Sequence, residues 1–193
     1  MRRTPIVAIL ILLTAAMFVS MPELSTQQTE SARLDVALSK QNYSVDETVV
    51  VIYRITNLSN SLICFPPPAV DCYSISGELA ATATPPKGVS RPNVSRGCAA
   101  DRFVDRDAGF DIDHHWIKLA PLQTYEIKRE SHSIRLMGAG RWLVEAGYVP
   151  MREDTQSLYQ SGLKERGCTL LPELHSTKVR VLVHIHSLTN ESG

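Results

Sequence analysis

Alternation of apolar and polar residues with a period of two is the feature that most constrains the fold of this 193-residue chain. The alternation is clearest over residues 140–149, where every second side chain is apolar: Trp142, Val144, Ala146 and Tyr148. Successive side chains of a β-strand point to opposite faces of the sheet, so this pattern predicts a strand with one buried face. We expect Trp142 to point into a core.

Related patterns recur along the chain and predict an all-β domain. Strands are expected over residues 34–38, 124–133 and 178–186. Residues 48–56 are dense in β-branched and aromatic residues, as in a central strand that is covered on both faces. Few segments have a helical period, and prolines and glycines separate the strands. About seven short strands of this kind predict two packed antiparallel sheets, a β-sandwich with two long loops.

The N-terminus carries the pattern of an export signal. Arg2 and Arg3 precede an apolar run over residues 6–19, and a charged segment followed by such a run is typical of a signal peptide. The run holds 14 residues, fewer than the roughly 20 that cross a membrane, which favours a cleaved signal peptide over a signal anchor. Phe18 stands where the cleavage pattern has a small residue, so an uncleaved anchor stays open.

These features divide the chain into a signal peptide or signal anchor (1–20), a polar linker (21–31), one domain (32–188) and a tail (189–193). About 160 residues are enough for a single core and few for two. We expect the protein to be exported, to the periplasm, the cell envelope or the outside, and to contact a membrane only if the first segment is not removed. Twenty basic residues balance twenty acidic ones, which disfavours nucleic acid as a partner.

The chain has four cysteines: Cys64, Cys72, Cys98 and Cys168. An even number in an exported chain favours two disulfides over free thiols. Three connectivities are possible, and we prefer Cys64 with Cys72 and Cys98 with Cys168. A zinc site with four cysteines is the alternative, but no C-x-x-C pair is present to support it.

Three stretches resemble a pattern of exported bacterial immunoglobulin-like domains. They are LDVALSKQNYSVDETVVVIYRITNLSN (34–60), LAPLQTYEIKRE (119–130) and GRWLVEAGYV (140–149). In such domains a first strand leads through a turn with a tyrosine into a strand that ends in T-N-x-S. An L-x-P step then feeds a later strand, and G-x-W-x-V-x-A-x-Y forms a late core strand. The resemblance implies an immunoglobulin-like β-sandwich and implies nothing about chemistry.

Two regions, 85–112 and 151–176, are longer than the loops of a plain sandwich. Loops of this length are often functional or disordered. The second region is expected to hold one or two helical turns around residues 156–164, ended by Gly167. If Cys98 and Cys168 pair, the two loops form one stapled surface at an end of the sandwich, where a binding site is expected.

The densest group of potential metal ligands lies at residues 111–115 (DIDHH). In an extended segment Asp111, Asp113 and His115 would share one side and form a partial metal site. Nearby arginines can neutralise the same carboxylates, so a solvated loop with ion pairs is the competing interpretation.

Three functions are compatible with these observations. The first is a non-catalytic exported module that binds a protein or glycan partner through loops or a sheet edge, with Trp116 as an exposed aromatic contact. The second is a proteinase-inhibitor-like domain, in which residues 64–68 (CFPPP) present Phe65 on a rigid loop. The third is a small metal-dependent enzyme that uses the partial metal site. Since common catalytic and cofactor-binding motifs do not occur, we expect a non-enzyme without a cofactor.

Overall fold

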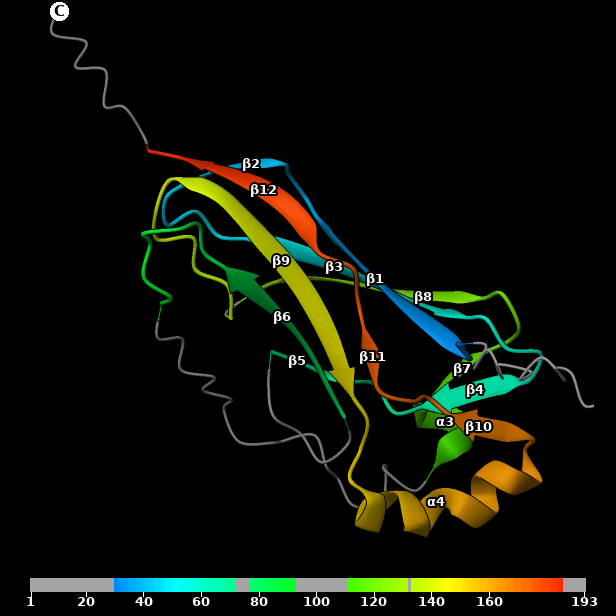
Figure 1. Cartoon of the computed structure of the whole chain (residues 1–193). Coiled ribbons are helices and arrows are strands. Elements are labelled where there is room, and N and C mark those ends of the chain that lie inside the picture. Colours follow the sequence, from blue (N-terminus) through cyan, green and yellow to red (C-terminus); the bar gives the residue numbers. More distant parts are fainter. Residues whose placement is uncertain (1–29, 72–76, 93–110, 132, 186–193) are drawn as a thin grey trace, which may run out of the picture.

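The computed structural model of the chain describes residues 30–71, 77–92, 111–131 and 133–185. The export segment, the tail and two of the four cysteines lie outside the described residues. Within the described part, no helix combines the length and the apolar character that a membrane crossing needs. Figure 1 shows how the strands and helices are arranged.

Three antiparallel strands form the first sheet, in the order β1-β3-β8. They are β1 (Ala32–Leu38), β3 (Val50–Asn57) and β8 (Thr124–Glu130). β3 lies in the centre, but only one of its faces is covered: Tyr53 is buried, whereas Arg54 is exposed. The expectation that this strand is covered on both faces is therefore wrong, and its alternation is that of a sheet with one face on the core.

The second sheet is larger and has the order β2-β12-β9-β6-β5, with β11 beside β9. Its strands are β2 (Asn42–Ser44), β5 (Ala69–Val70), β6 (Glu78–Thr84), β9 (Gly140–Val149), β11 (Leu174–His175) and β12 (Val179–His184). β9 is antiparallel to β6 and β12, whereas β2 runs parallel to β12 and β5 parallel to β6. The expectation of purely antiparallel sheets is therefore wrong at these short strands. β2 is parallel because the chain passes from β1 to the second sheet without reversing.

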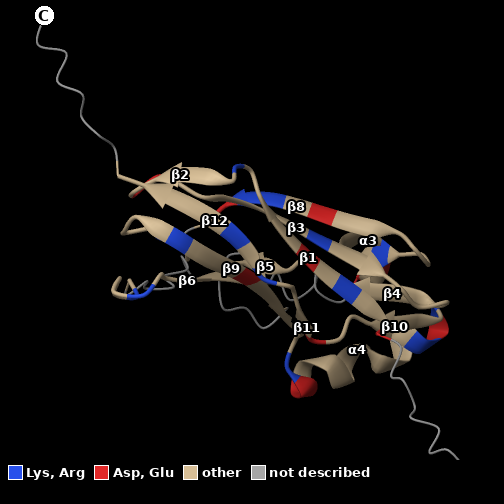
Figure 2. Ribbon diagram, turned by 45° about the horizontal axis from the view of Figure 1, so that its top comes forward, with Lys and Arg blue, Asp and Glu red and all other residues tan. Residues whose placement is uncertain are grey.

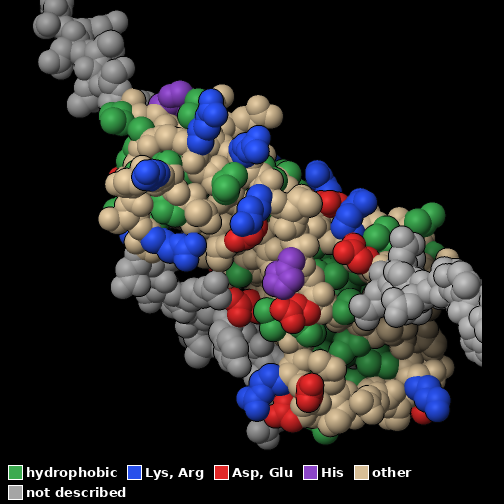
Figure 3. Space-filling model, in the orientation of Figure 1, with side chains coloured by type: hydrophobic (Ala, Val, Ile, Leu, Met, Phe, Trp, Pro, Cys, Tyr) green, Lys and Arg blue, Asp and Glu red, His purple; other side chains and the backbone are tan. Residues whose placement is uncertain are grey.

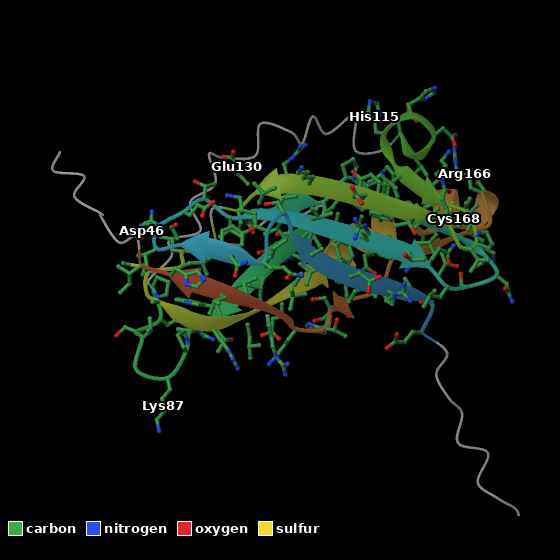
Figure 4. The ribbon with its side chains drawn as sticks, turned by 90° about the horizontal axis from the view of Figure 1, so that it is seen from above. Asp46, Lys87, His115, Glu130, Arg166 and Cys168 are labelled. Atoms are coloured by element: carbon green, nitrogen blue, oxygen red, sulfur yellow. A yellow bond between two sulfur atoms is a disulfide. The ribbon has the colours of Figure 1, made fainter. Side chains whose placement is uncertain are left out.

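The two sheets form separate layers (Figure 4), and the side chains between them make one core. Trp142 on β9 is fully buried, as predicted, and its indole Nε1 donates to the backbone oxygen of Gly138 at 2.9 Å. Both sheets contribute to this core, for example with Leu34, Tyr53, Ile55, Leu79, Val144, Tyr148 and Val181. We call the two sheets the body. The prediction of an all-β domain is confirmed.

A third, smaller sheet stands at one end of the body, in the order β10-β4-β7. It consists of β4 (Leu62–Phe65), β7 (Ile117–Leu119) and β10 (Cys168–Leu170), and the helices α3 (Ile112–His115) and α4 (Glu153–Glu165) lie near it. The region 151–176, expected to be a long loop, is mostly regular structure, since α4 spans 13 residues and β10 pairs with β4. Gly167 follows α4 with a left-handed φ of 62° and ends the helix where predicted.

Candidate functional site

Three insertions meet at one end of the body. They follow β3 (residues 58–71), precede β8 (111–123) and follow β9 (150–178). β3 and β8 are antiparallel, so the end of β3 lies beside the start of β8, and β9 ends on the same side of the body (Figure 1). The insertions contribute β4, α3 with β7, and α4 with β10. We call these five elements the cap; they gather at the lower right of Figure 1.

A disulfide joins two of the insertions: Cys64 on β4 is bonded to Cys168 on β10, with the Cα atoms 5.6 Å apart. The predicted pairs, Cys64 with Cys72 and Cys98 with Cys168, are therefore wrong. The reason is the parallel ladder between β10 and β4, which brings together cysteines that are 104 residues apart. Cys72 and Cys98 lie outside the described residues. Closing a loop of this length stabilises the fold by about 4.7 kcal/mol in the chain-entropy account.

A small apolar cluster lies at the centre of the cap. Its buried members are Cys64, Ile112, Trp116, Met151 and Leu163. Trp116 is only 7% exposed, and its ring packs on Tyr159 of α4 with the ring centroids 5.0 Å apart. Burial raises the pKa of the Tyr159 hydroxyl. The expectation that Trp116 is exposed is wrong, because the helix that covers it comes from a distant insertion.

Phe65 on β4 is fully buried as well. Its ring meets Tyr125 of β8 and Tyr148 of β9 edge-on, with centroid distances of 5.9 and 6.1 Å. Phe65 therefore packs the cap onto the core of the body. An inhibitor-like loop over residues 64–68 requires an accessible Phe65, and the structure places this side chain out of reach of a partner.

Asp113 of α3 links the parts of the cap through charge. Its Oδ1 accepts hydrogen bonds from Arg166 Nε and Lys118 Nζ, both at 2.9 Å, and its Oδ2 accepts one from Arg166 Nη2 at 2.5 Å. The guanidinium of Arg166, and next the ammonium of Lys118, hold the pKa of Asp113 well below its ordinary value. The carboxylate therefore stays charged at neutral pH and ties α3 to β7 and to the end of α4.

The three residues predicted as a partial metal site do not converge on one point. Asp111 caps α3, because its Oδ1 accepts hydrogen bonds from the backbone N–H groups of Asp113 and His114. The ring of His114, whose Nδ1 lies 2.7 Å from Asp111 Oδ2, lowers the pKa of Asp111. His115 is exposed on α3 (Figure 4). In the part of the chain that the structure describes, no three His, Cys, Asp or Glu side chains gather to hold a metal ion.

Asn57, at the end of β3, fastens the cap to the first sheet. It is fully buried, and its Nδ2 donates to the backbone oxygens of Ser61 and Leu119, both at 2.8 Å. Its Oδ1 accepts hydrogen bonds from the N–H and the hydroxyl of Ser59 at 2.8 and 2.7 Å. The sequence showed only T-N-x-S, a turn-like motif. These contacts give the motif a physical role, because the asparagine side chain accepts hydrogen bonds from the serine two residues later.

Leu122 is the most unusual residue of this end. It follows Pro121 in a turn that is closed by a hydrogen bond from Gln123 N–H to the Ala120 oxygen at 3.0 Å. Its φ is 64°, in the left-handed region, which costs a residue with a side chain about 1–2 kcal/mol. The side chain is nevertheless 79% exposed and contributes little to packing. The L-x-P step was expected only to feed the following strand, and no signal in the sequence indicated a leucine where such turns favour glycine.

Exposed hydrophobic side chains are concentrated near the cap. Of seven large ones among the described residues, four lie in or directly beside it: Leu58, Leu122, Val149 and Leu158. A shallow groove of about 490 Å³ runs between α4 and β10 and is lined by both polar and apolar residues, among them Gln156, Gln160, Lys164, Leu163 and Leu170. Figure 3 shows hydrophobic side chains gathered at this end, next to α4. The cap therefore offers a rigid, mixed surface.

No protein-family model matches the chain, and a comparison with curated proteins found no similar sequence. The geometry of the cap is therefore the main evidence for its role. The side chains that hold the cap together are buried or paired with one another, and those left at its surface include aliphatic, amide and charged groups, for example Leu158, Gln160 and Lys164. Such a surface is suited to contact with another molecule.

Proposed function

We propose that the protein is an exported, non-catalytic immunoglobulin-like module that binds a protein partner with its cap. The observation that carries the proposal is Leu122, whose strained backbone holds a large aliphatic side chain in solvent. Strained positions of this kind cluster at functional surfaces. A protein is favoured over a glycan because four large aliphatic side chains are exposed in or beside the cap, and aliphatic surface contributes to binding when another apolar surface covers it.

The strand order supports an immunoglobulin-like sandwich. If β1, β3, β6, β8, β9 and β12 correspond to strands A, B, C, E, F and G, the observed orders β1-β3-β8 and β12-β9-β6 equal A-B-E and G-F-C. The chain departs from antibody domains in two respects. Its buried tryptophan, Trp142, lies on the F-like strand rather than the C-like strand, and its disulfide joins two insertions rather than strands B and F. The resemblance is therefore to the general architecture.

The same correspondence supports binding at the cap. In variable domains of antibodies, the B–C and F–G loops lie at one end of the sandwich and carry the binding site. Here the equivalent insertions, 58–71 and 150–178, contain β4, α4 and β10 and are joined by Cys64–Cys168. A disulfide between binding loops lowers the entropy lost on docking, since the surface is already ordered.

Two observations support export. Residues 1–20 have the pattern of a signal segment, and the disulfide is of a kind that persists in oxidising compartments.

The proposal is tested by capturing partners from the native envelope fraction on immobilised protein and identifying them by mass spectrometry. Leu122→Ala should weaken capture of the partner about tenfold or more, the effect of losing a central contact. Met137→Ala is the matched control, because Met137 is 53% exposed and lies in the segment between β8 and β9, at the opposite end of the body.

Capture that survives Leu122→Ala contradicts the cap as the binding surface. Equal loss with Leu122→Ala and Met137→Ala contradicts it too, because the two positions lie at opposite ends. If the retained species is carbohydrate, the partner belongs to the glycan class and the choice of a protein is wrong.

A further inference from the structure

β8 is an edge strand, since among the described residues only β3 pairs with it. Two hydrogen bonds show which backbone groups of β8 point at β3. Ser131 N–H donates to Val49 O at 2.8 Å, and Asn57 N–H donates to Gln123 O at 3.0 Å. Residues opposite each other in an antiparallel ladder are alternately bonded and non-bonded, so odd-numbered residues of β8 direct their N–H and C=O groups at β3. The even-numbered residues direct theirs to the free edge: Thr124, Glu126, Lys128 and Glu130.

An open groove of about 460 Å³ runs along this free edge. Pro67, Pro68 and Val70 line it together with the residues of β8. The two prolines have no N–H group to donate to β8. The edge therefore combines outward-facing backbone groups with adjacent space, which is the condition under which a sheet accepts a further strand.

The sequence of β8 complements itself when it is read in the opposite direction. In an antiparallel pair with Ile127 opposite the partner subunit's Ile127, Glu126 faces the partner's Lys128, and Lys128 faces the partner's Glu126. Thr124 then faces the partner's Glu130. The even-numbered positions in these pairs direct their backbone groups to the free edge. The register that pairs opposite charges therefore also forms the main-chain hydrogen bonds.

We propose that this edge joins a second copy of the chain, β8 to β8, around a two-fold axis through Ile127. The two copies of the first sheet then form one continuous six-stranded sheet, with the same surface used on both sides. The occupant is a second copy rather than an unrelated strand because the order of charges on β8 is its own complement.

The neighbouring registers are unfavourable. A shift that places Glu126 opposite the partner's Glu126 sets like charges against each other, and so does one that places Lys128 opposite the partner's Lys128. Registers halfway between these oppose an edge-facing residue to one that faces β3, and the main-chain bonds are lost. Charge and backbone direction thus select one arrangement.

Contacts within the chain fit the same arrangement. Arg54 on β3 pairs with Glu126 through a 2.7 Å bond from its Nε, while Lys128 lies opposite Ile52 and forms no ion pair within the described residues. Figure 2 shows acidic and basic positions on β8 beside the basic position on β3. In the dimer Glu126 lies between Arg54 and the partner's Lys128. Tyr125 faces the partner's Arg129, a pairing suited to a cation–π contact.

The test uses two single variants of the protein expressed from the full-length chain, with mass measured by light scattering and sedimentation. Wild-type protein should reach the mass of a dimer at concentrations up to about 1 mM. Lys128→Glu and Glu126→Lys should each raise the dimer dissociation constant about tenfold or more, because each sets like charges opposite each other twice. An equal mixture of the two variants should recover dimerisation, since every opposed pair then has opposite signs.

Thr124→Val is the control for a change at the same edge without charge, and it should leave the mass unchanged. A wild-type protein that stays monomeric throughout overturns the proposal. A mixture that stays monomeric although each variant keeps its β circular dichroism overturns it as well. Dimerisation that both charge variants leave unchanged contradicts this edge as the interface. Capture of the partner is measured in a separate experiment with Leu122→Ala, so either proposal can fail without the other.

Discussion

The body and the cap rest on different amounts of buried surface. Among the described residues, the core of the body has 24 buried members, whereas the cap cluster has five. A core this small rarely holds three insertions in place without cross-links. The cap accordingly has the Cys64–Cys168 disulfide and the ion pair of Asp113 with Arg166.

β4 shows how the two regions are joined. Ile63 and Phe65 belong to the core of the body, and Cys64 between them belongs to the cap cluster. One strand thus serves both regions through its two faces. The stability of the body should depend on side-chain volume, whereas the stability of the cap should depend on cross-links and pH.

The largest effect is expected in the body. Trp142→Ala should lower the free energy of unfolding by about 3–5 kcal/mol, because it empties a fully buried site and removes the bond to Gly138. Urea unfolding followed by circular dichroism measures it. Leu182→Ala on the neighbouring strand, where the side chain is 37% exposed, should change the free energy by about 0.5 kcal/mol or less. Equal effects of the two variants would mean that burial does not decide the stability of the body.

Removal of the cross-link should come next in size. The double variant Cys64→Ala with Cys168→Ala should lose about 2–5 kcal/mol, because the unfolded chain is no longer closed into a loop. Thermal unfolding of the double variant, compared with oxidised wild-type protein, measures the effect, and reduced wild-type protein is the control. A variant as stable as the oxidised protein would show that the disulfide is not needed to hold the insertions.

Acidification should loosen the cap before the body. The folded-state pKa of Asp113 is lowered, so its contribution to stability is fully present above about pH 4, the ordinary range of an aspartate, and is lost as the pH falls toward the lowered pKa. The emission of Trp116, isolated in a Trp142→Phe background, should report this loss.

Asp113→Asn serves as the comparison for the acid experiment. It should shift the emission of Trp116 already at neutral pH and remove the part of the acid transition that depends on this carboxylate. An acid transition that is identical in Asp113→Asn would assign the effect to other groups.

The smallest effect on stability is expected at Leu122. Leu122→Gly relieves a left-handed backbone but adds flexibility to the unfolded chain, so the two terms nearly cancel and leave a gain between zero and about 1 kcal/mol. Chemical denaturation measures it, and Leu122→Ala, which keeps a side chain in the strained conformation, is the control. A clear loss of stability in Leu122→Gly would mean that the leucine serves packing rather than a partner.

Local patterns in the sequence predicted the body well. Alternation placed Trp142, Val144 and Tyr148 inward, because the period of side chains along a strand depends on neighbours in sequence. Gly167 was predicted to end a helix for the same local reason. The direction of β2 and β5 could not be predicted, since it depends on the path of the chain between sheets.

The cap was predicted poorly because its contacts are long-range. Cys64 meets Cys168 through a ladder between two insertions, and Trp116 is buried by a helix from the later one. Spacing favoured a local partner for Cys64, and the neighbouring acidic segment favoured exposure of Trp116. Neither pattern contains information on distant segments. For Asp113 the sequence left a metal site and a loop with ion pairs open, and it gave no indication that the ion-pair partner is Arg166, in a separate insertion.

The difference between body and cap is tested most directly by hydrogen exchange of the backbone amides, measured by mass spectrometry on oxidised protein and on the variant without Cys64 and Cys168. We predict that exchange in α4 and β10 becomes about tenfold faster or more without the cross-link, as for a region that opens by itself, while β9 and β12 keep their protection. Faster exchange throughout the chain, or unchanged exchange in α4, would contradict a cap that is held separately from the body.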